Sequence, residues 1–244
     1  MSTRPASHAG TWYSADPAWA YACMDPSTIR TVLVLGPSHV SFLRGCALTQ
    51  YASVDTPLGP IEVNAQLNEE LRQSSLFQMM EHDLDIREHS LEMHYPYIRK
   101  VWDSHPVTIV PILVGDMSAF TRQKIAQYLA KYAADPSVGI VVSSDFCHWG
   151  ERFRYTRYQA SHDAAPQVLT SRSPSSAYAA CPIHKSIEAL DIDAMARISF
   201  DKGGVWHAHD RFKSYIMTTR NTICGQHPIL LLLLMLYELE KQAK

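Results

Sequence analysis

Three short apolar runs along the chain predict strands that are buried on both faces. "TVLVLG" (31–36), "VTIVPILVG" (107–115) and "GIVVSS" (139–144) lack the apolar–polar alternation of a half-exposed strand. Continuous runs of this kind are typical of parallel sheets, which helices cover on both faces. Pro111 lies inside the second run. Because proline cannot donate a ladder hydrogen bond, we expect that strand to lie at an edge or to contain a bulge.

Apolar residues at helical spacing predict helices between and after these strands. In "IEVNAQLNEELRQS" (61–74), Val63, Leu67 and Leu71 recur every four residues, as on one face of a helix. Four further helices are predicted over 88–102, 118–135, 184–200 and 228–241. Strands that alternate with helices indicate an α/β fold with a mostly parallel central sheet flanked by helices. We expect one domain over residues 1–244.

Two segments follow neither period. "TSRSPSSAYAACP" (170–182) is rich in Ser, Pro and Ala, and "FDKGGVWHAHDRF" (200–212) carries a Gly-Gly pair and two histidines. Both are therefore predicted to be loops, and neither marks a domain boundary.

Composition narrows the class of protein. Hydrophobic residues make up 46% of the chain and charged residues 19%, as in an ordinary globular protein. The net charge of −2 lacks the excess of positive charge that is typical of nucleic-acid-binding proteins. The most apolar run (229–237) is about half of the ~20 residues that span a membrane, so we expect a buried helix and no membrane insertion. Five irregularly spaced cysteines favour a reducing compartment over a disulfide framework. We expect a cytoplasmic protein, with the nucleus open as a second location.

Chemistry-bearing residues follow two of the predicted strands, where parallel α/β sheets bind their ligands. The first strand leads to His39 of "GPSH", and the third leads to "SSDFCHWG" with Asp145, Cys147 and His148. A later motif, "NTICGQHP", carries Cys224. Imidazole and thiolate together suit iron, copper or zinc. The ordinary alternatives stay open: most histidines are structural, and Cys147 can be a small buried hydrophobic residue.

Six motifs occur in the order found in the Memo family, which this chain resembles. They are "SHAGTWY", "LGPSH", "REHSLEMHYPY", "VPILVG", "VVSSDFCHWGERFRY" and "NTICGQHPI". The family is linked to receptor-driven cell motility and signalling, and its fold resembles that of class III extradiol dioxygenases, which are non-haem iron enzymes. The resemblance therefore implies a metal pocket and a non-haem, metal-dependent oxidoreductase as the candidate activity.

The resemblance also assigns roles to individual residues. Iron or copper would be bound by His39 and Cys224, while Asp145 and His148 would be the catalytic pair that handles protons. Substrate or peptide contacts fall on five residues of these motifs: His8, Trp12, His89, His94 and Arg152.

The chain departs from the family pattern in several places. The "PHAGY" motif with the family's second histidine ligand is absent, which implies an internal deletion after about residue 15. Segments 170–182 and 201–212 look like insertions, and the family usually adds one or two strands after the final helix. We therefore expect an incomplete sheet and a weakened metal site, because non-haem iron oxygenases generally use three protein ligands.

Three alternatives to a metal-dependent redox protein remain. One is a non-catalytic adaptor that binds phosphotyrosine-type peptides or a receptor tail, with Arg152, Arg154 and Arg157 as phosphate contacts. Another is an inactive truncated product. Outside the family, a zinc-dependent hydrolase would use the same His and Cys clusters.

Overall fold

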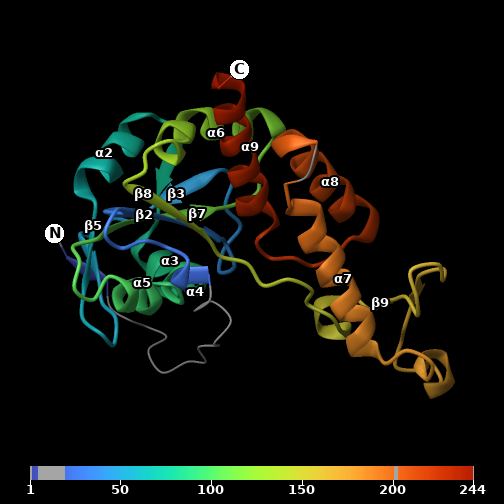
Figure 1. Cartoon of the computed structure of the whole chain (residues 1–244). Coiled ribbons are helices and arrows are strands. Elements are labelled where there is room, and N and C mark those ends of the chain that lie inside the picture. The colour runs from blue at the N-terminus through green and yellow to red at the C-terminus, as the bar shows by residue number, and fades with distance from the viewer. Residues whose placement is uncertain (1, 5–19, 201–202, 244) are drawn as a thin grey trace. The chain divides into compact units, whose positions relative to one another are not determined.

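The computed structural model describes residues 2–4, 20–200 and 203–243, which form two compact units (Figure 1). The first unit comprises Met1–Ser144 with His227–Lys244, and the second comprises Asp145–Gln226. The second unit is therefore inserted between two parts of the first along the chain. The expectation that residues 1–244 form one family domain stays a prediction.

The first unit contains a mixed but mostly parallel sheet. Its strands are β1 Thr3–Arg4, β2 Thr31–Pro37, β3 Cys46–Leu48, β4 Ser53–Val54, β5 Ile61–Val63, β6 Phe77–Met79, β7 Thr108–Val114 and β8 Val138–Val142. The strand order is β1-β4-β5-β7-β2-β8, and β3 pairs with both β6 and β7. The β4–β5 and β3–β7 pairs are antiparallel and the other pairs of this sheet are parallel. The predicted α/β class with a mostly parallel central sheet is confirmed.

Helices cover both faces of this sheet (Figure 1). They are α2 Ala65–Gln73, α3 His82–Arg87, α4 His89–Glu92, α5 Tyr95–Val101, α6 Ala119–Ala133 and α9 Gln226–Gln242. Because successive side chains of a strand point to opposite faces, Leu33 and Leu35 of β2 pack in one core with α2, α6 and α9. Val32 and Val34 pack in the other core, against α4 and α5. All seven residues of β2 are buried, as its continuous apolar run predicts.

The proline in β7 does not place this strand at an edge, so the edge alternative of that prediction is wrong. β7 pairs with β2 on one side and with β5 and then β3 on the other. The Ile109 carbonyl accepts the Asn64 N–H on the β5 side, and strand alternation places the Pro111 nitrogen on that same side. Pro111 lies where the partner changes from β5 to β3, so the missing N–H falls in a gap of the ladder.

The helix predicted over 61–74 begins later than its periodicity suggests. Ile61–Val63 forms β5, and α2 starts after Asn64, whose side chain accepts the Leu67 N–H as an N-cap. Val63 is therefore a strand residue, whereas Leu67 and Leu71 are the buried face of α2. The cap decides the boundary, because an Asn oxygen satisfies an N–H group that the first helical turn leaves unpaired.

The second unit is built mainly from helices and irregular segments. Its elements are η1 Glu151–Phe153, β9 Arg157–Tyr158, β10 Gln167–Val168, η2 Ser175–Tyr178, α7 Ile183–Ile198 and α8 Gly204–Thr219. Segment 170–182 contains only the short η2, close to the predicted loop. Segment 200–212 differs from its prediction, because α8 begins at Gly204. Ala208, Phe212 and Tyr215 form its buried face, and the Tyr215 hydroxyl donates to the Leu190 carbonyl at 2.9 Å.

The apolar run near the end of the chain is part of a buried helix. Ile229, Leu230, Leu231 and Leu233 lie in α9 and are at most 8% exposed. None of the helices in the described ranges is both long and apolar enough to cross a bilayer.

Candidate functional site

Two irregular backbone segments of the second unit, 145–148 and 222–224, lie side by side and carry three of the predicted site residues. The Cys224 N–H donates to the Asp145 carbonyl at 3.2 Å, and the Asp145 N–H donates to Cys224 Sγ at 3.1 Å. At the other end, the His148 N–H donates to Thr222 Oγ1 at 3.0 Å, and the Thr222 hydroxyl donates to the His148 carbonyl. These reciprocal bonds hold segment 145–148 against segment 222–224.

This pairing brings a carboxylate, an imidazole and a thiol together. One ligand atom from each of Asp145, His148 and Cys224 lies within 4.8 Å of the others. His148 Nε2 is 3.8 Å from Asp145 Oδ2. Asp145 is 86% exposed, whereas His148 and Cys224 are half-buried. The two segments that carry these residues are 74 or more positions apart in sequence, and the fold brings them together.

Cys147 points to a different environment from its neighbour His148. The Cys147 N–H donates to Asp191 Oδ1 at 3.0 Å, and burial together with the Asp191 charge raises the pKa of the Cys147 thiol to about 12. A thiol with so high a pKa is a poor nucleophile and a poor metal ligand. Cys147 is half-buried, so it is more exposed than the interpretation as a small buried hydrophobic residue implies.

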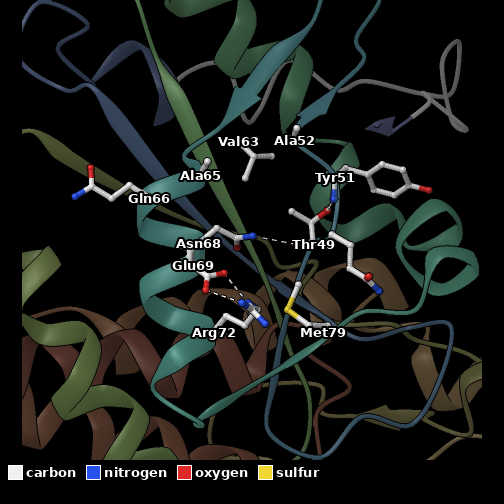
Figure 2. A pocket seen from close by; sticks show the side chains of 11 residues that line it. Thr49, Tyr51, Ala52, Val63, Ala65, Gln66, Asn68, Glu69, Arg72 and Met79 are labelled. Carbon is white, nitrogen blue, oxygen red and sulfur yellow. Dashed lines mark hydrogen bonds and ion pairs between the residues drawn. The ribbon is translucent and has the colours of Figure 1, made fainter. Parts of the chain in front are cut away.

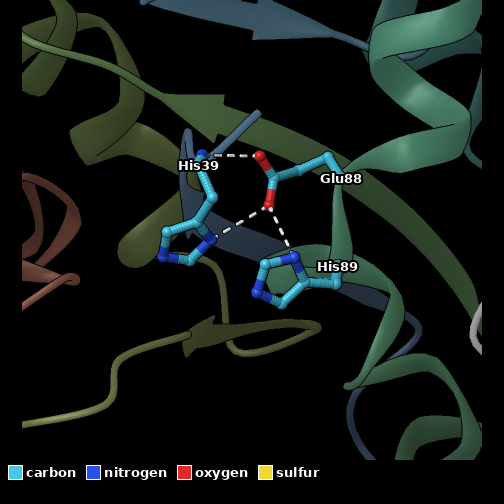
Figure 3. Close-up of side chains that lie close together, drawn as sticks. All are labelled: His39, Glu88 and His89. Carbon is cyan, nitrogen blue, oxygen red and sulfur yellow. Dashed lines mark hydrogen bonds and ion pairs between the residues drawn. The ribbon is translucent and has the colours of Figure 1, made fainter. Parts of the chain in front are cut away.

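A second cluster lies in the first unit, beyond the carboxyl end of β2. His39 Nδ1 is 3.1 Å from Glu88 Oε1, and His89 Nδ1 is 3.8 Å from the same oxygen (Figure 3). The two imidazole rings are stacked, with centroids 4.6 Å apart and an angle of 14° between the planes. His39 belongs to the first unit and Cys224 to the second, and their joint binding of one ion stays a prediction.

Glu88 is the member of this cluster that sequence reasoning missed. Its carboxylate also accepts the backbone N–H groups of His39 at 2.7 Å, Val40 at 3.3 Å and Ser90 at 3.0 Å. These hydrogen bonds and the His39 imidazole outweigh the effect of burial and lower the pKa of Glu88 to about 2. Its signal in the sequence was an acidic residue at the start of a predicted helix, where its side chain accepts the Ser90 N–H as an N-cap.

A buried arginine fixes the segment that carries Glu88. Arg4 of β1 is 1% exposed and donates to the carbonyl groups of Asp85, Ile86 and Glu88, at the end of α3. The same guanidinium pairs with the carboxylates of Asp85 and Glu92 at 3.2 and 3.0 Å. Cationic groups at a helix C-terminus satisfy its unpaired carbonyls, so Arg4 stabilises the corner between α3 and α4.

The remaining predicted residues occupy varied positions. His94 precedes α5, and its Nδ1 lies 2.8 Å from the Tyr21 hydroxyl. Arg152 is exposed in η1, and its guanidinium lies 5.6 Å from the centre of the Phe153 ring, which in turn packs edge-on against His148. His8 and Trp12 lie outside the described residues.

An open hollow of about 680 Å³ lies between α2 and the segment that joins β3 to β4 (Figure 2). Its wall combines apolar Val63 and Met79 with Asn68, whose amide donates to the Thr49 carbonyl at 3.0 Å. Among the residues that the structure describes, the predicted site residues do not line this hollow.

Comparisons with known proteins add an independent line of evidence. A family model described as "Memo-like protein" matches residues 6–244. "Protein MEMO1" of Xenopus laevis is 40% identical over 240 residues, covering 97% of this chain and 72% of its own. The Homo sapiens protein of that name is 39% identical with the same coverage. "Protein memo-1 homolog" of Caenorhabditis elegans is 37% identical over 227 residues, covering 93% of this chain and 58% of its own.

One solved structure, of an uncharacterized protein from Escherichia coli K12, aligns with a TM-score of 0.49 and 14% identity. The alignment covers 93% of this chain and 81% of that one, and the likeness is too distant to carry an argument about function.

Proposed function

Because the chain belongs to the Memo-like protein family, we propose that it binds iron or copper through the imidazole and thiolate groups of its family motifs and acts as a redox protein. Cys224 is the thiolate ligand, with His148 and Asp145 beside it in the second unit. His39 of the first unit is the ligand that the "GPSH" motif predicts.

The observation that supports this proposal most strongly is the hydrogen bonding of His148. Its Nδ1 lies 2.8 Å from the Thr222 carbonyl oxygen, which can only accept. Nδ1 must therefore carry the proton, and in the neutral ring Nε2 offers a lone pair. Metal-binding histidines almost always have their second nitrogen fixed by a carbonyl or carboxylate in this way. The lone pair is directed to the side where Asp145 Oδ2 lies 3.8 Å away.

The donor set fits a transition metal of intermediate softness. A thiolate, an imidazole and a carboxylate within 4.8 Å suit iron, copper or zinc far better than calcium or magnesium, which prefer oxygen ligands. The backbone N–H of Asp145 already donates to Cys224 Sγ, which helps to hold the sulfur in place. Bound iron or copper would supply one-electron redox chemistry.

The chain's own residues would then have separate roles in moving protons and in holding the His148 ring. Asp145 is exposed enough to exchange protons with water and, at 3.8 Å from His148 Nε2, is close enough to pass them on through one water molecule. Phe153 packs edge-on against the His148 ring and limits its rotation. His148 is thus either a ligand or a proton carrier, and the two roles differ in what its removal changes.

Anaerobic calorimetric titration of the purified chain with Fe(II) and with Cu(I) tests the proposal. Cys224→Ser should lower the affinity by more than the 10- to 100-fold that loss of an outer partner brings, and His148→Gln should do so only if His148 is a ligand. His162→Gln is the matched control, because His162 also lies beside a carboxylate, at 3.3 Å from Asp163, but is fully exposed. Equal affinity in all four proteins would refute the site.

His148→Gln separates the two roles of this residue. A lower metal affinity identifies a ligand, whereas unchanged affinity with altered pH dependence of metal oxidation identifies a proton carrier.

A second candidate function is binding of a phosphotyrosine-type peptide, as expected for a signalling adaptor linked to cell motility. It is favoured by the exposed Arg152 guanidinium next to the Phe153 ring, since such a pair offers a cation for phosphate and an apolar face for an aromatic ring. Fluorescence anisotropy with a phosphotyrosine peptide should lose its signal with Arg152→Gln and keep it with Cys224→Ala.

A further inference from the structure

The Glu88 carboxylate is built into the first unit as a fixed acceptor. It is 1% exposed, and both of its oxygens are in use: Oε1 accepts from Ser90 N–H and faces His39 Nδ1, while Oε2 accepts the N–H groups of His39 and Val40. Arg4 in addition holds the Glu88 carbonyl at 3.2 Å. A carboxylate so fully engaged is poorly placed to be a metal ligand and well placed to orient its neighbours.

The contact with Glu88 decides which nitrogen of His39 carries the proton. An ionised carboxylate only accepts, so His39 Nδ1, 3.1 Å from Oε1, must donate. The lone pair of the neutral ring is therefore on Nε2, at the edge of the ring that points away from Glu88 (Figure 3). The backbone N–H of the same residue is bound to Oε2, so the main chain and the ring of His39 are fixed by one side chain.

His89 does not converge with His39 on a single ion. A metal ion lies in the plane of the imidazole that binds it, about 2 Å from the nitrogen. The two rings are stacked with centroids 4.6 Å apart and only 14° between their planes, so a single ion cannot lie in the plane of both rings. His89 instead covers one face of the His39 ring and restricts its rotation.

From these contacts we infer that Glu88 is the positioning residue of the metal site. It holds His39 as the Nδ1–H tautomer, so that Nε2 is the coordinating nitrogen, while His89 packs on the His39 ring and is not a ligand. This inference rests on the proposed function, in which His39 binds the metal. It adds the identity of the ligand atom and the residue that selects it.

Nuclear magnetic resonance of the metal-free chain tests the tautomer directly. Long-range ¹H–¹⁵N correlation spectra report which imidazole nitrogen is protonated, and His39→Gln identifies the His39 signals. The expected result is Nδ1–H for His39. Observation of Nε2–H for His39 in the wild-type chain overturns the inference.

Glu88→Gln tests whether the Glu88 carboxylate is what selects the His39 tautomer. A glutamine can present only one acceptor atom, so the amide NH₂ must face either His39 Nδ1 and the Ser90 N–H or the backbone N–H groups of His39 and Val40. Keeping the two backbone bonds inverts the His39 tautomer to Nε2–H. We expect this inversion, together with a 10- to 100-fold loss of Co²⁺ affinity, read from the absorption spectrum of the cobalt-loaded chain. An unchanged tautomer and affinity in a folded Glu88→Gln protein would refute the positioning role.

His89→Phe is the matched control, because it keeps a stacked ring and removes both nitrogens. Its Co²⁺ affinity should stay within about 10-fold of wild type, the smallest effect expected for an outer partner. A larger loss would make His89 a ligand and overturn that part of the inference. If wild type binds no Co²⁺ but His39 is the Nδ1–H tautomer, the proposed function fails while the assignment of Glu88 stands.

Discussion

Replacing Arg4 with methionine should be among the most destabilising single changes in the first unit. The guanidinium is 1% exposed and pairs with Asp85 and Glu92, which are 2% and 3% exposed. Breaking a buried ion pair by removing one partner costs about 3–5 kcal/mol, because the other charge stays buried. Burial already raises the pKa of Asp85, and Arg4 is one of the groups that lower it. For a chain of this size, the loss corresponds to a fall in Tm of roughly 6–20 °C.

Urea unfolding of Arg4→Met, followed by far-ultraviolet circular dichroism, measures this loss. Arg72→Met is the matched control, since Arg72 pairs with Glu69 at 2.6 Å but both side chains are exposed, and such pairs contribute about 0–1 kcal/mol. Adding Asp85→Asn and Glu92→Gln to Arg4→Met should recover part of the stability by removing the stranded charges. A change within about 0.5 kcal/mol for Arg4→Met would refute the reasoning, because it would equal an ordinary surface substitution.

Three further predictions address other parts of the chain. A Cβ on Gly115 would lie 2.1 Å from the Leu43 carbonyl oxygen, whereas one on Gly139 meets the flexible end of Met24 at 2.6 Å; Gly115→Ala should therefore cost about 3 kcal/mol in urea unfolding, clearly more than Gly139→Ala. With a pKa of about 12, Cys147 is roughly 0.01% thiolate at pH 8, so mass spectrometry should find it unmodified by brief iodoacetamide treatment. The folded pKa of Glu88 is about 2 against an ordinary 4.5, so its contribution of about 3 kcal/mol is present above pH 4.5 and is lost as the pH falls toward 2; the stability difference between wild type and Glu88→Gln should shrink over that range, and a constant difference would contradict the assignment.

Hydrophobic pattern was sufficient to predict the layers of the first unit. The runs at 31–36 and 139–144 are strands, and Leu67 and Leu71 of α2 face the core. β2 is buried along its whole length, as its apolar run predicts. The burial predicted for the third run is wrong, because β8 is at the end of the strand order and only Gly139 of its five residues is fully buried. The central position of Pro111 could not be predicted, since it depends on two short strands that share one side of β7. Local pattern carries no information about such a gap.

Helix α8 was missed for a related reason. Gly-Gly and two histidines at 200–212 suggest a loop, but the helix continues to Thr219 and owes its stability to Phe212 and Tyr215, which lie at or beyond the end of that window. Tertiary packing of one face overrides weak local propensity.

The candidate site was predictable in its parts and less so in its connections. Asp145, His148 and Cys224 were identified from their motifs, and the structure brings them together. Glu88 was not identified, because its significance lies in the three backbone N–H groups and the imidazole that surround it. A sequence lists side chains, whereas these contacts depend on main-chain groups, two of which lie beyond the end of β2, 49 and 48 residues away in sequence.

The paired segments 145–148 and 222–224 lie at the two ends of the second unit, and a metal held there would act as a cross-link. Asp145 and Cys224 are 79 residues apart in sequence. Closing a loop of that length restricts the unfolded chain by about 4–5 kcal/mol in the chain-entropy account of cross-links. An ion at this position would thus determine whether the inserted segment stays closed at its base, and gain or loss of metal would become a change in folding cooperativity as well as in chemistry.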